Sequence, residues 1–223
     1  MIRKSDWENI DKGVRQGLLK DPDLHDFLEP VFPTFELRET FIARCLRKIS
    51  TRRMLLRAQW YIEIADDQEK VRQSRPALRL IFLMSLAEAI AKKKHGNTHL
   101  RPFDAITEFF KFISVKDKNK LTSTFTRCLL GPNHHSLRFS SILRILYDVR
   151  NRAVHGEDYF SFSLMNQKRK EEHTHYASFS LISSGYLGPS KRKRRVSLDI
   201  RLTYEELRDI FRRTAIANIE PLL

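Results

Sequence analysis

The side chains best suited to chemistry lie at the end of one predicted helix, residues 136–155. With Ile142 at zero and about 100° of rotation per residue, Asn151 lies at about 180° and His155 at about 220°, away from the apolar side. They are four residues apart, which lets the amide orient the imidazole. Arg150, at about 80°, can lean its long side chain towards the same place. An imidazole that exchanges protons near neutral pH, beside an amide and a guanidinium, suits proton transfer next to a phosphate.

Periodicity alone also allows a structural role for these residues. A histidine near the end of a helix more often interacts with the last carbonyl groups as a cap. The helix itself is predicted from apolar residues at positions i, i+3, i+4, i+7 and i+11, which form one stripe. The stripe consists of Ile142, Ile145, Leu146, Val149 and Ala153.

A second predicted helix, residues 77–93, is apolar on nearly all sides and is expected to lie at the centre of the protein. Ser74 and Pro76 precede it as a capping serine and a first-turn proline, and Gly96 marks its end. Glu88 is its acidic residue. A buried carboxylate needs a partner, so we expect a basic side chain to contact Glu88.

The remaining pattern predicts a mainly α protein with one small β-hairpin near the C-terminus. Two alternating stretches, 176–182 and 195–202, flank a turn-rich basic loop and are expected to pair. Thr203 and Glu206 have the spacing of a capping box and open a last helix to about residue 218. We expect residues 1–73 to form an N-terminal helical extension of unknown role and residues 74–223 the main helical domain. Other helices are predicted at 6–19, in one or two pieces within 34–71, at 103–113 and at 118–130.

The composition points to an anionic partner. The chain has 223 residues, with 41 Lys and Arg against 27 Asp and Glu, and a formal net charge of +14. This surplus favours a polyanion, most simply nucleic acid, with a merely basic protein as the alternative. No apolar stretch reaches the roughly 20 residues of a membrane span, and we see no signal peptide. We therefore expect a cytoplasmic protein without a membrane partner, and the two cysteines, Cys45 and Cys128, fit a reducing compartment.

A resemblance to a known family lies at the end of the predicted helix 136–155. The residues that carry it are Tyr147-Asp148-Val149-Arg150-Asn151-Arg152-Ala153-Val154-His155-Gly156. This stretch resembles the signature of the HEPN superfamily, an arginine, a polar residue that is often asparagine, and a histidine after a short spacer. Arg150, Asn151 and His155 match these positions. The apolar helix upstream, with Glu88, also looks like this family. The resemblance covers about residues 74–223.

The resemblance implies a HEPN-type helical bundle that cleaves RNA as a homodimer with a composite active site, without a metal or another cofactor. Arg150, Asn151 and His155 would be catalytic. His155 would act on the ribose 2′-hydroxyl, Arg150 would stabilise charge on the phosphoryl oxygens, and Asn151 would orient the imidazole. The products would carry 2′,3′-cyclic phosphate and 5′-hydroxyl ends.

The family also suggests a biological setting. Such endoribonucleases typically act as toxins or antiviral defence effectors, so a regulatory or antitoxin protein is an expected partner. Many members of the superfamily are instead non-catalytic modules that dimerise and bind nucleic acid or a protein partner, and this is the alternative function.

Two basic segments are candidate RNA-binding surfaces, one face of residues 38–57 and the predicted hairpin loop 191–195. For residues 38–57 the pattern alone favours the solvated side of an amphipathic helix, whereas for the loop a solvated tip and an RNA contact fit equally well. No set of His and Cys residues has the spacing of a zinc site, so we expect no metal. The residues predicted to contact RNA are Arg152, Arg44, Arg47, Lys48, Arg52, Arg53, Lys191, Arg192, Lys193, Arg194 and Arg195.

Overall fold

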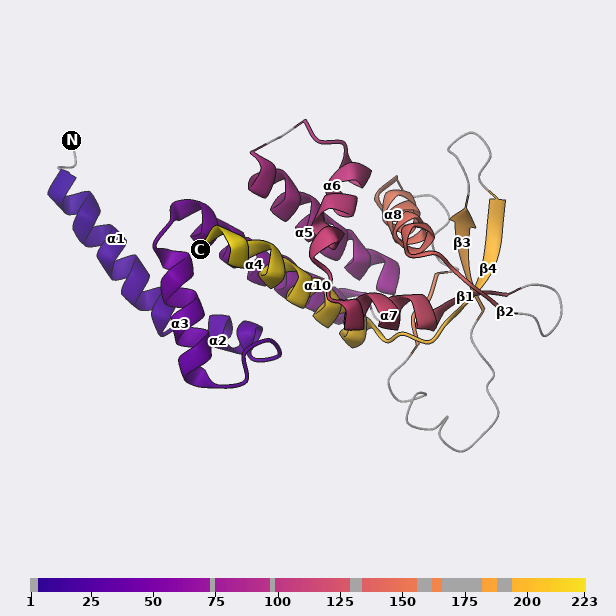
Figure 1. Ribbon diagram of the computed structural model, residues 1–223, viewed down its shortest axis with the longest axis horizontal. Helices are drawn as coiled ribbons and strands as arrows, with labels where there is room; N and C mark the ends of the chain where they lie inside the picture. Colours follow the sequence, from indigo (N-terminus) through magenta and orange to yellow (C-terminus); the bar gives the residue numbers. More distant parts are fainter. Residues whose placement is uncertain are drawn as a thin grey trace.

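The protein is mainly helical, with a small antiparallel sheet at one end (Figure 1). This confirms the predicted fold class. The structure, a computed structural model, describes residues 4–72, 75–96, 99–128, 134–155, 162–165, 182–187 and 194–223. Helices α1 (Lys4–Leu19) and α3 (Phe35–Leu46) lie at the end of the molecule opposite the sheet (Figure 1). Helices α4 (Ile49–Val71), α5 (Pro76–His95) and α10 (Tyr204–Ile219) lie between that end and the sheet.

The N-terminal part consists of α1 (Lys4–Leu19), α2 (Pro22–Leu28), α3 (Phe35–Leu46) and α4 (Ile49–Val71). The segment 34–71 therefore forms two helices. Asp21 and Thr34 cap α2 and α3, because their side chains accept hydrogen bonds from the backbone N–H groups of Asp23 and Leu37. The first helix begins at Lys4, slightly before the predicted start.

The central helix is α5 (Pro76–His95), and it ends at Gly96, whose φ of 60° is the left-handed conformation that glycine tolerates. Its N-cap is Arg75, which makes no capping hydrogen bond from its side chain. The predicted cap, Ser74, lies outside the described residues. The last helix is α10 (Tyr204–Ile219), and the predicted capping box is present between Thr203 and Glu206. The short 3₁₀ helix η2 (Glu220–Leu222) follows α10.

The middle of the chain departs from the prediction at one helix. The segments α6 (Pro102–Phe109) and η1 (Phe110–Phe112) form the expected aromatic helix. The next helix, α7 (Val115–Thr124), ends earlier than predicted, because the chain becomes strand β1 (Phe125–Cys128). Phe125 pairs with Ile200, so this strand depends on a partner 75 residues away. Local periodicity does not detect such pairing.

The sheet has the strand order β2-β1-β4-β3, with antiparallel neighbours throughout. Its other strands are β2 (His134–Ser136), β3 (Ile182–Leu187) and β4 (Arg194–Ile200). The predicted hairpin is present as β3 and β4, but its first strand is displaced, since residues 183–187 were expected in the loop and 176–181 lie outside the described residues. Helix α8 (Phe139–His155) starts later than predicted because Ser136 belongs to β2.

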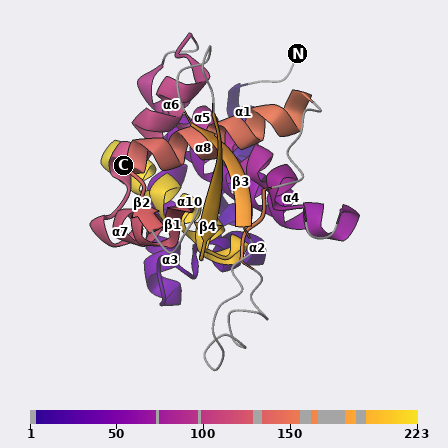
Figure 2. The same ribbon diagram turned by 90° about the vertical axis from the view of Figure 1, so that its right-hand side faces the viewer.

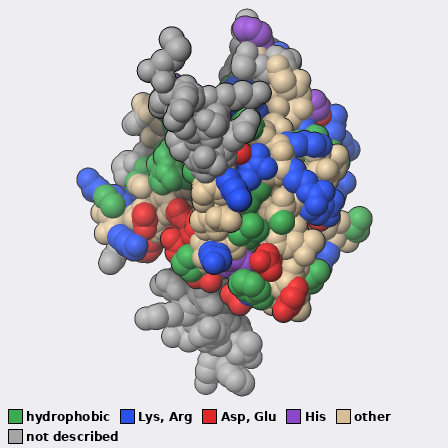
Figure 3. All heavy atoms as spheres, turned by 90° about the vertical axis from the view of Figure 1, so that its left-hand side faces the viewer, with side chains coloured by type: hydrophobic (Ala, Val, Ile, Leu, Met, Phe, Trp, Pro, Cys, Tyr) green, Lys and Arg blue, Asp and Glu red, His purple; other side chains and the backbone are tan. Residues whose placement is uncertain are grey.

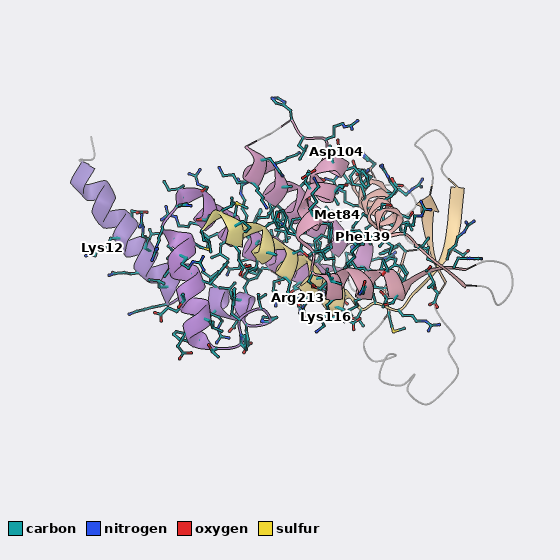
Figure 4. All side chains as sticks on the ribbon, viewed as in Figure 1. Lys12, Met84, Asp104, Lys116, Phe139 and Arg213 are labelled. Atoms are coloured by element: carbon teal, nitrogen blue, oxygen red, sulfur yellow. The ribbon has the colours of Figure 1, made fainter. Side chains whose placement is uncertain are left out.

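One hydrophobic core joins the two parts of the chain. Helix α4 packs on α5 and α10, and the buried residues from Leu24 to Ile219 form a single cluster. Met84 of α5 is fully buried in the middle of the helical layer, whereas Lys12 of α1 lies at its far end (Figure 4). The core therefore extends across the predicted boundary at residues 73 and 74.

A polar network links α4, α5 and α10 beside this core. The Tyr204 hydroxyl donates to Asp66 Oδ1 at 2.8 Å, and the Arg208 guanidinium donates to Asp66 Oδ2 at 3.1 Å. The Arg79 guanidinium lies over the Tyr204 ring, 3.2 Å from its centroid, and donates to Glu69. Burial and the Asp66 carboxylate raise the pKa of Tyr204, which keeps its hydroxyl protonated as the donor.

The buried thiol of Cys45 makes the stability sensitive to alkaline pH. Burial raises the pKa of Cys45 from its ordinary value of 9.0 to about 12. The folded state therefore holds this proton more tightly than the unfolded state, and its contribution to stability is full below pH 9.0 and lost as the pH rises through 12. Within that window we expect the free energy of unfolding to fall more steeply in the wild type than in Cys45→Ala, measured by urea denaturation. Equal slopes would contradict the assignment.

Candidate functional site at the end of helix α8

Helix α8 carries its apolar stripe into the core as predicted. Ile142, Ile145, Leu146 and Val149 are buried, and the helix packs against α5, α6, α7 and β3. Figure 2 shows α8 between the sheet and the other helices. Its last turn emerges from the core: Val154 and His155 are exposed and residues 151–153 are partly buried.

Arg150 is held at this end of α8 by a carboxylate from the central helix. Its Nη2 lies 3.2 Å from Glu88 Oε1, and the two side chains are only 20% and 12% exposed. The contact has the distance of an ion pair without the alignment of a hydrogen bond. Lys92 lies 3.9 Å from the other Glu88 oxygen. The expectation that Glu88 contacts a basic side chain is confirmed.

Asn151 contacts Arg150 in this structure, in contrast to its predicted contact with His155. Its Oδ1 accepts a hydrogen bond from Arg150 Nη1 at 2.9 Å. A charge-assisted hydrogen bond to the neighbouring guanidinium is stronger than a bond between neutral groups, which favours this contact. Glu88 and Asn151 together orient the guanidinium of Arg150, and the imidazole of His155 extends from the exposed end of the helix.

Arg150 and His155 diverge within one chain. Five residues of α-helix separate them by about 140° around the axis and about 7.5 Å along it. Arg150 turns towards α5 and its Glu88, whereas His155 faces solvent. Two such groups can act on one phosphate when a second copy of the chain supplies one of them.

Asp148 is a buried polar residue of this region that the sequence reasoning did not single out. It lies at about 240° on the same helical wheel, close to His155. We expected this face to point away from the core, but Asp148 is 2% exposed. The polar face of α8 is therefore covered about two turns before His155, and no local sequence signal reveals this, because the covering elements come from elsewhere in the chain.

The predicted RNA-contacting residues of the first basic segment are mostly exposed. Arg44, Arg47, Lys48 and Arg53 are exposed, whereas Arg52 forms an ion pair with Asp11 at 2.6 Å. Lys48 also donates to the backbone oxygen of Leu222. Lys and Arg side chains gather over one part of the face shown in Figure 3, and Asp and Glu side chains gather mainly over another.

The structure describes only some of the other residues that we predicted to contact RNA. Lys191, Arg192 and Lys193 lie outside the described residues, and Arg194 and Arg195 belong to β4, whereas we predicted a loop. Arg152 is partly buried on α8. The described part of the chain contains no group of three or more His, Cys, Asp or Glu residues that could hold a metal ion. None of the described helices is long and apolar enough to cross a membrane.

Comparison with known proteins identifies no relative of this chain. No protein-family model matches the chain, and no curated protein or solved structure matches it significantly. The fold and the site define a mainly helical protein in which a glutamate of the central helix orients an arginine of α8, and the last turn of α8 exposes a histidine. Assignment to the HEPN superfamily rests on the motif residues and remains a prediction.

Removing the negative charge of Glu88 tests how strongly Arg150 depends on it. We expect Glu88→Gln to lower the free energy of unfolding by about 1–3 kcal/mol, because the guanidinium loses its charged partner in a poorly hydrated place. Glu39→Gln on the exposed face of α3 is the matched control and should change stability by less than about 0.5 kcal/mol. Urea denaturation measures the change in the free energy of unfolding for both variants. Equal changes would contradict the role of Glu88 in positioning Arg150.

Proposed function

We propose that this protein is a metal-independent endoribonuclease of the HEPN type, acting in the cytoplasm as a homodimer. The observation that carries the proposal is the Arg150 guanidinium, oriented by Glu88 and Asn151 at the same helix end that exposes His155. The exposed cations at the end of α3, together with the net charge of +14, suit capture of an RNA strand.

The proposed reaction is an internal transfer at phosphorus. The imidazole of His155 accepts the proton of a ribose 2′-hydroxyl while that oxygen attacks the adjacent phosphorus. The bond from phosphorus to the 5′-oxygen breaks, and this oxygen takes a proton and leaves as a hydroxyl. Arg150 from the second copy stabilises the negative charge that builds on the phosphoryl oxygens. The products are a 2′,3′-cyclic phosphate and a 5′-hydroxyl, so a 2′-deoxy strand is not cut.

We further propose that the activity is restrained in the cell. An endoribonuclease without restraint degrades the RNA of its host, so a toxin or antiviral defence effector needs a controlling partner. Within the parts of the chain that the structure describes, no separate sensor domain is present. The regulator or antitoxin is therefore proposed to be another chain.

A non-catalytic binding module is the second candidate function. One observation favours it: Glu88 already pairs with the guanidinium of Arg150, as it would for a purely structural arginine. In this case the protein dimerises and binds nucleic acid or a partner through its basic surface without cutting RNA.

The experiment that separates the two functions uses the purified protein with single-stranded RNA in excess chelator. The endoribonuclease proposal expects cleavage without added metal, cyclic phosphate at the new 3′ ends, and no cleavage of the matched DNA. Binding without cleavage selects the non-catalytic module. Cleavage that requires a metal ion contradicts the proposed mechanism.

A further inference from the structure

Helix α4 exposes a line of large apolar side chains on its outer face. Ile49, Trp60 and Val71 are 58%, 55% and 71% exposed. They are spaced eleven residues apart, and eleven residues make about three helical turns with a drift of only about 20°, so the three side chains form one line along the helix. Isolated exposed apolar residues are ordinary, but an aligned set along a 23-residue helix marks an interaction surface.

The inner face of α4 already has its partners. Buried side chains such as Met54, Leu55 and Ile62 face α5 and α10. The outer face has a shallow hollow of about 540 Å³ around Trp60, and among the residues that the structure describes its lining comes from α4. Its lining residues are Arg53, Leu56, Arg57, Gln59, Trp60 and Glu63.

The charges of α4 divide at Trp60. Residues 49–60 contain three arginines and no acidic residue. Residues 61–71 contain four acidic residues and one lysine. Arg53 and Arg57 are exposed, and within the described part of the chain neither forms an ion pair. Arg52, Asp66 and Glu69 already pair with Asp11, Arg208 and Arg79. The outer face of α4 therefore has a basic half, Arg53 and Arg57, and an acidic half, Glu63 and Asp67, on either side of the exposed Trp60.

A surface that is basic at one end and acidic at the other complements its own copy when the two run antiparallel. We propose that a second copy of this chain docks on the outer face of α4, with the two α4 helices antiparallel and Trp60 at the two-fold axis. In that register Arg57 faces Glu63 of the partner subunit. Arg53 faces Asp67 of the partner subunit, and Ile49 faces Val71 of the partner subunit.

The spacing along α4 suits such a helix pair. Exposed or partly exposed residues recur at alternating intervals of four and three, the pattern by which two helices interlock their side chains. A two-fold axis at Trp60 places Leu56 opposite Ile64 of the partner subunit, so apolar contacts flank the tryptophan on both sides. The recurring positions are Ile49, Arg53, Leu56, Trp60, Glu63, Asp67 and Lys70.

A bound nucleic acid strand would explain fewer features of this face than a second copy does. A base on Trp60 and phosphates on Arg53 and Arg57 would use the basic half alone. The acidic half would repel the strand, and Ile49 and Val71 would stay exposed. A second copy covers both halves, so the observations favour self-association. The inference goes beyond the proposed function and does not depend on it, because α4 contains none of the motif residues.

The test is the oligomeric state of the full chain without RNA, measured by sedimentation equilibrium. The wild type is expected to associate through α4, and Trp60→Glu is expected to form a smaller assembly than the wild type, because it places two carboxylates at the two-fold axis. Arg57→Glu and Glu63→Arg should each weaken the dimer by about tenfold or more, since each opposes two like charges. The double variant Arg57→Glu/Glu63→Arg restores both pairs and should return the affinity to nearly that of the wild type.

Controls keep the result specific. Val115→Glu changes a residue of α7 that is 76% exposed and should leave the dimer intact. Circular dichroism shows whether each variant is folded, and Trp60→Cys should cross-link to its own copy under mild oxidation, since the two sulfurs meet at the axis. A monomeric wild type, or a charge exchange that fails to restore the dimer, overturns the proposal. Loss of RNA affinity in Trp60→Glu with a monomeric wild type assigns the face to nucleic acid and also overturns it.

Discussion

His155→Ala is expected to lower the rate of RNA cleavage by about 10²–10⁴-fold, the usual contribution of a positioned general base. The side chain is exposed at the end of α8, so its loss should leave the fold intact. Val154→Ala, the exposed neighbour on the same turn, is the matched control and should cleave at nearly the wild-type rate. Single-turnover cleavage of a labelled RNA measures the rates. Cleavage by His155→Ala at the control rate would exclude this histidine from the chemistry.

Mixing two inactive variants tests the composite site itself. Arg150→Ala and His155→Ala each lack one group in every cleft of their own dimers. A mixed dimer contains one intact Arg150 and one intact His155 across the interface, so activity should return when the two proteins exchange subunits. This follows from the divergence of the two side chains within one chain. Activity that stays absent after verified exchange would mean that each chain needs both groups for itself.

Phe211→Ala is expected to have the largest effect on stability, a loss of about 3–5 kcal/mol in the free energy of unfolding. Phe211 of α10 is fully buried. Its ring lies 5.1 Å from that of Phe110 in an edge-on contact and 6.0 Å from that of Phe109 in a stacked one. Alanine removes both aromatic contacts and leaves a cavity where α10 meets α6 and η1.

Urea denaturation measures the loss, and Phe211→Leu provides the graded comparison. Leucine fills part of the same space, so its effect should fall between those of the wild type and alanine. Val115→Ala, at a side chain that is 76% exposed, should change the stability by less than about 0.5 kcal/mol. If Phe211→Ala is as mild as Val115→Ala, the packing of α10 on the aromatic cluster is not what holds this part of the core.

The fold was predictable where the signal is local. The apolar stripe from Ile142 to Val149 and the capping box at Thr203 each depend on residues within one helix, and both were found. Strand β1 was not, because Phe125 to Cys128 pair with β4, some seventy residues further along the chain, as well as with β2. The displaced hairpin has the same cause, since register depends on partners and not on alternation alone.

The candidate site was predictable in its residue types but not in all of its contacts. A lone carboxylate on an apolar helix implied a basic partner for Glu88, and Arg150 fills that place. The partner of Asn151 could not be predicted from spacing, because the amide reaches both Arg150 and His155 and the choice depends on where the guanidinium is held. The burial of Asp148 depends on which elements cover α8, and helical periodicity does not contain that information.

The network around Asp66 has a consequence for folding kinetics. It joins Asp66 to Tyr204 and Arg208, which lie 138 and 142 residues further along the chain. The α4–α5 pair can form early because its residues are close in sequence, whereas closing so long a loop comes late. Interactions that are absent from the transition state change the unfolding rate and leave the folding rate nearly untouched. We therefore expect the link between α4 and α10 to affect the unfolding rate more than the folding rate.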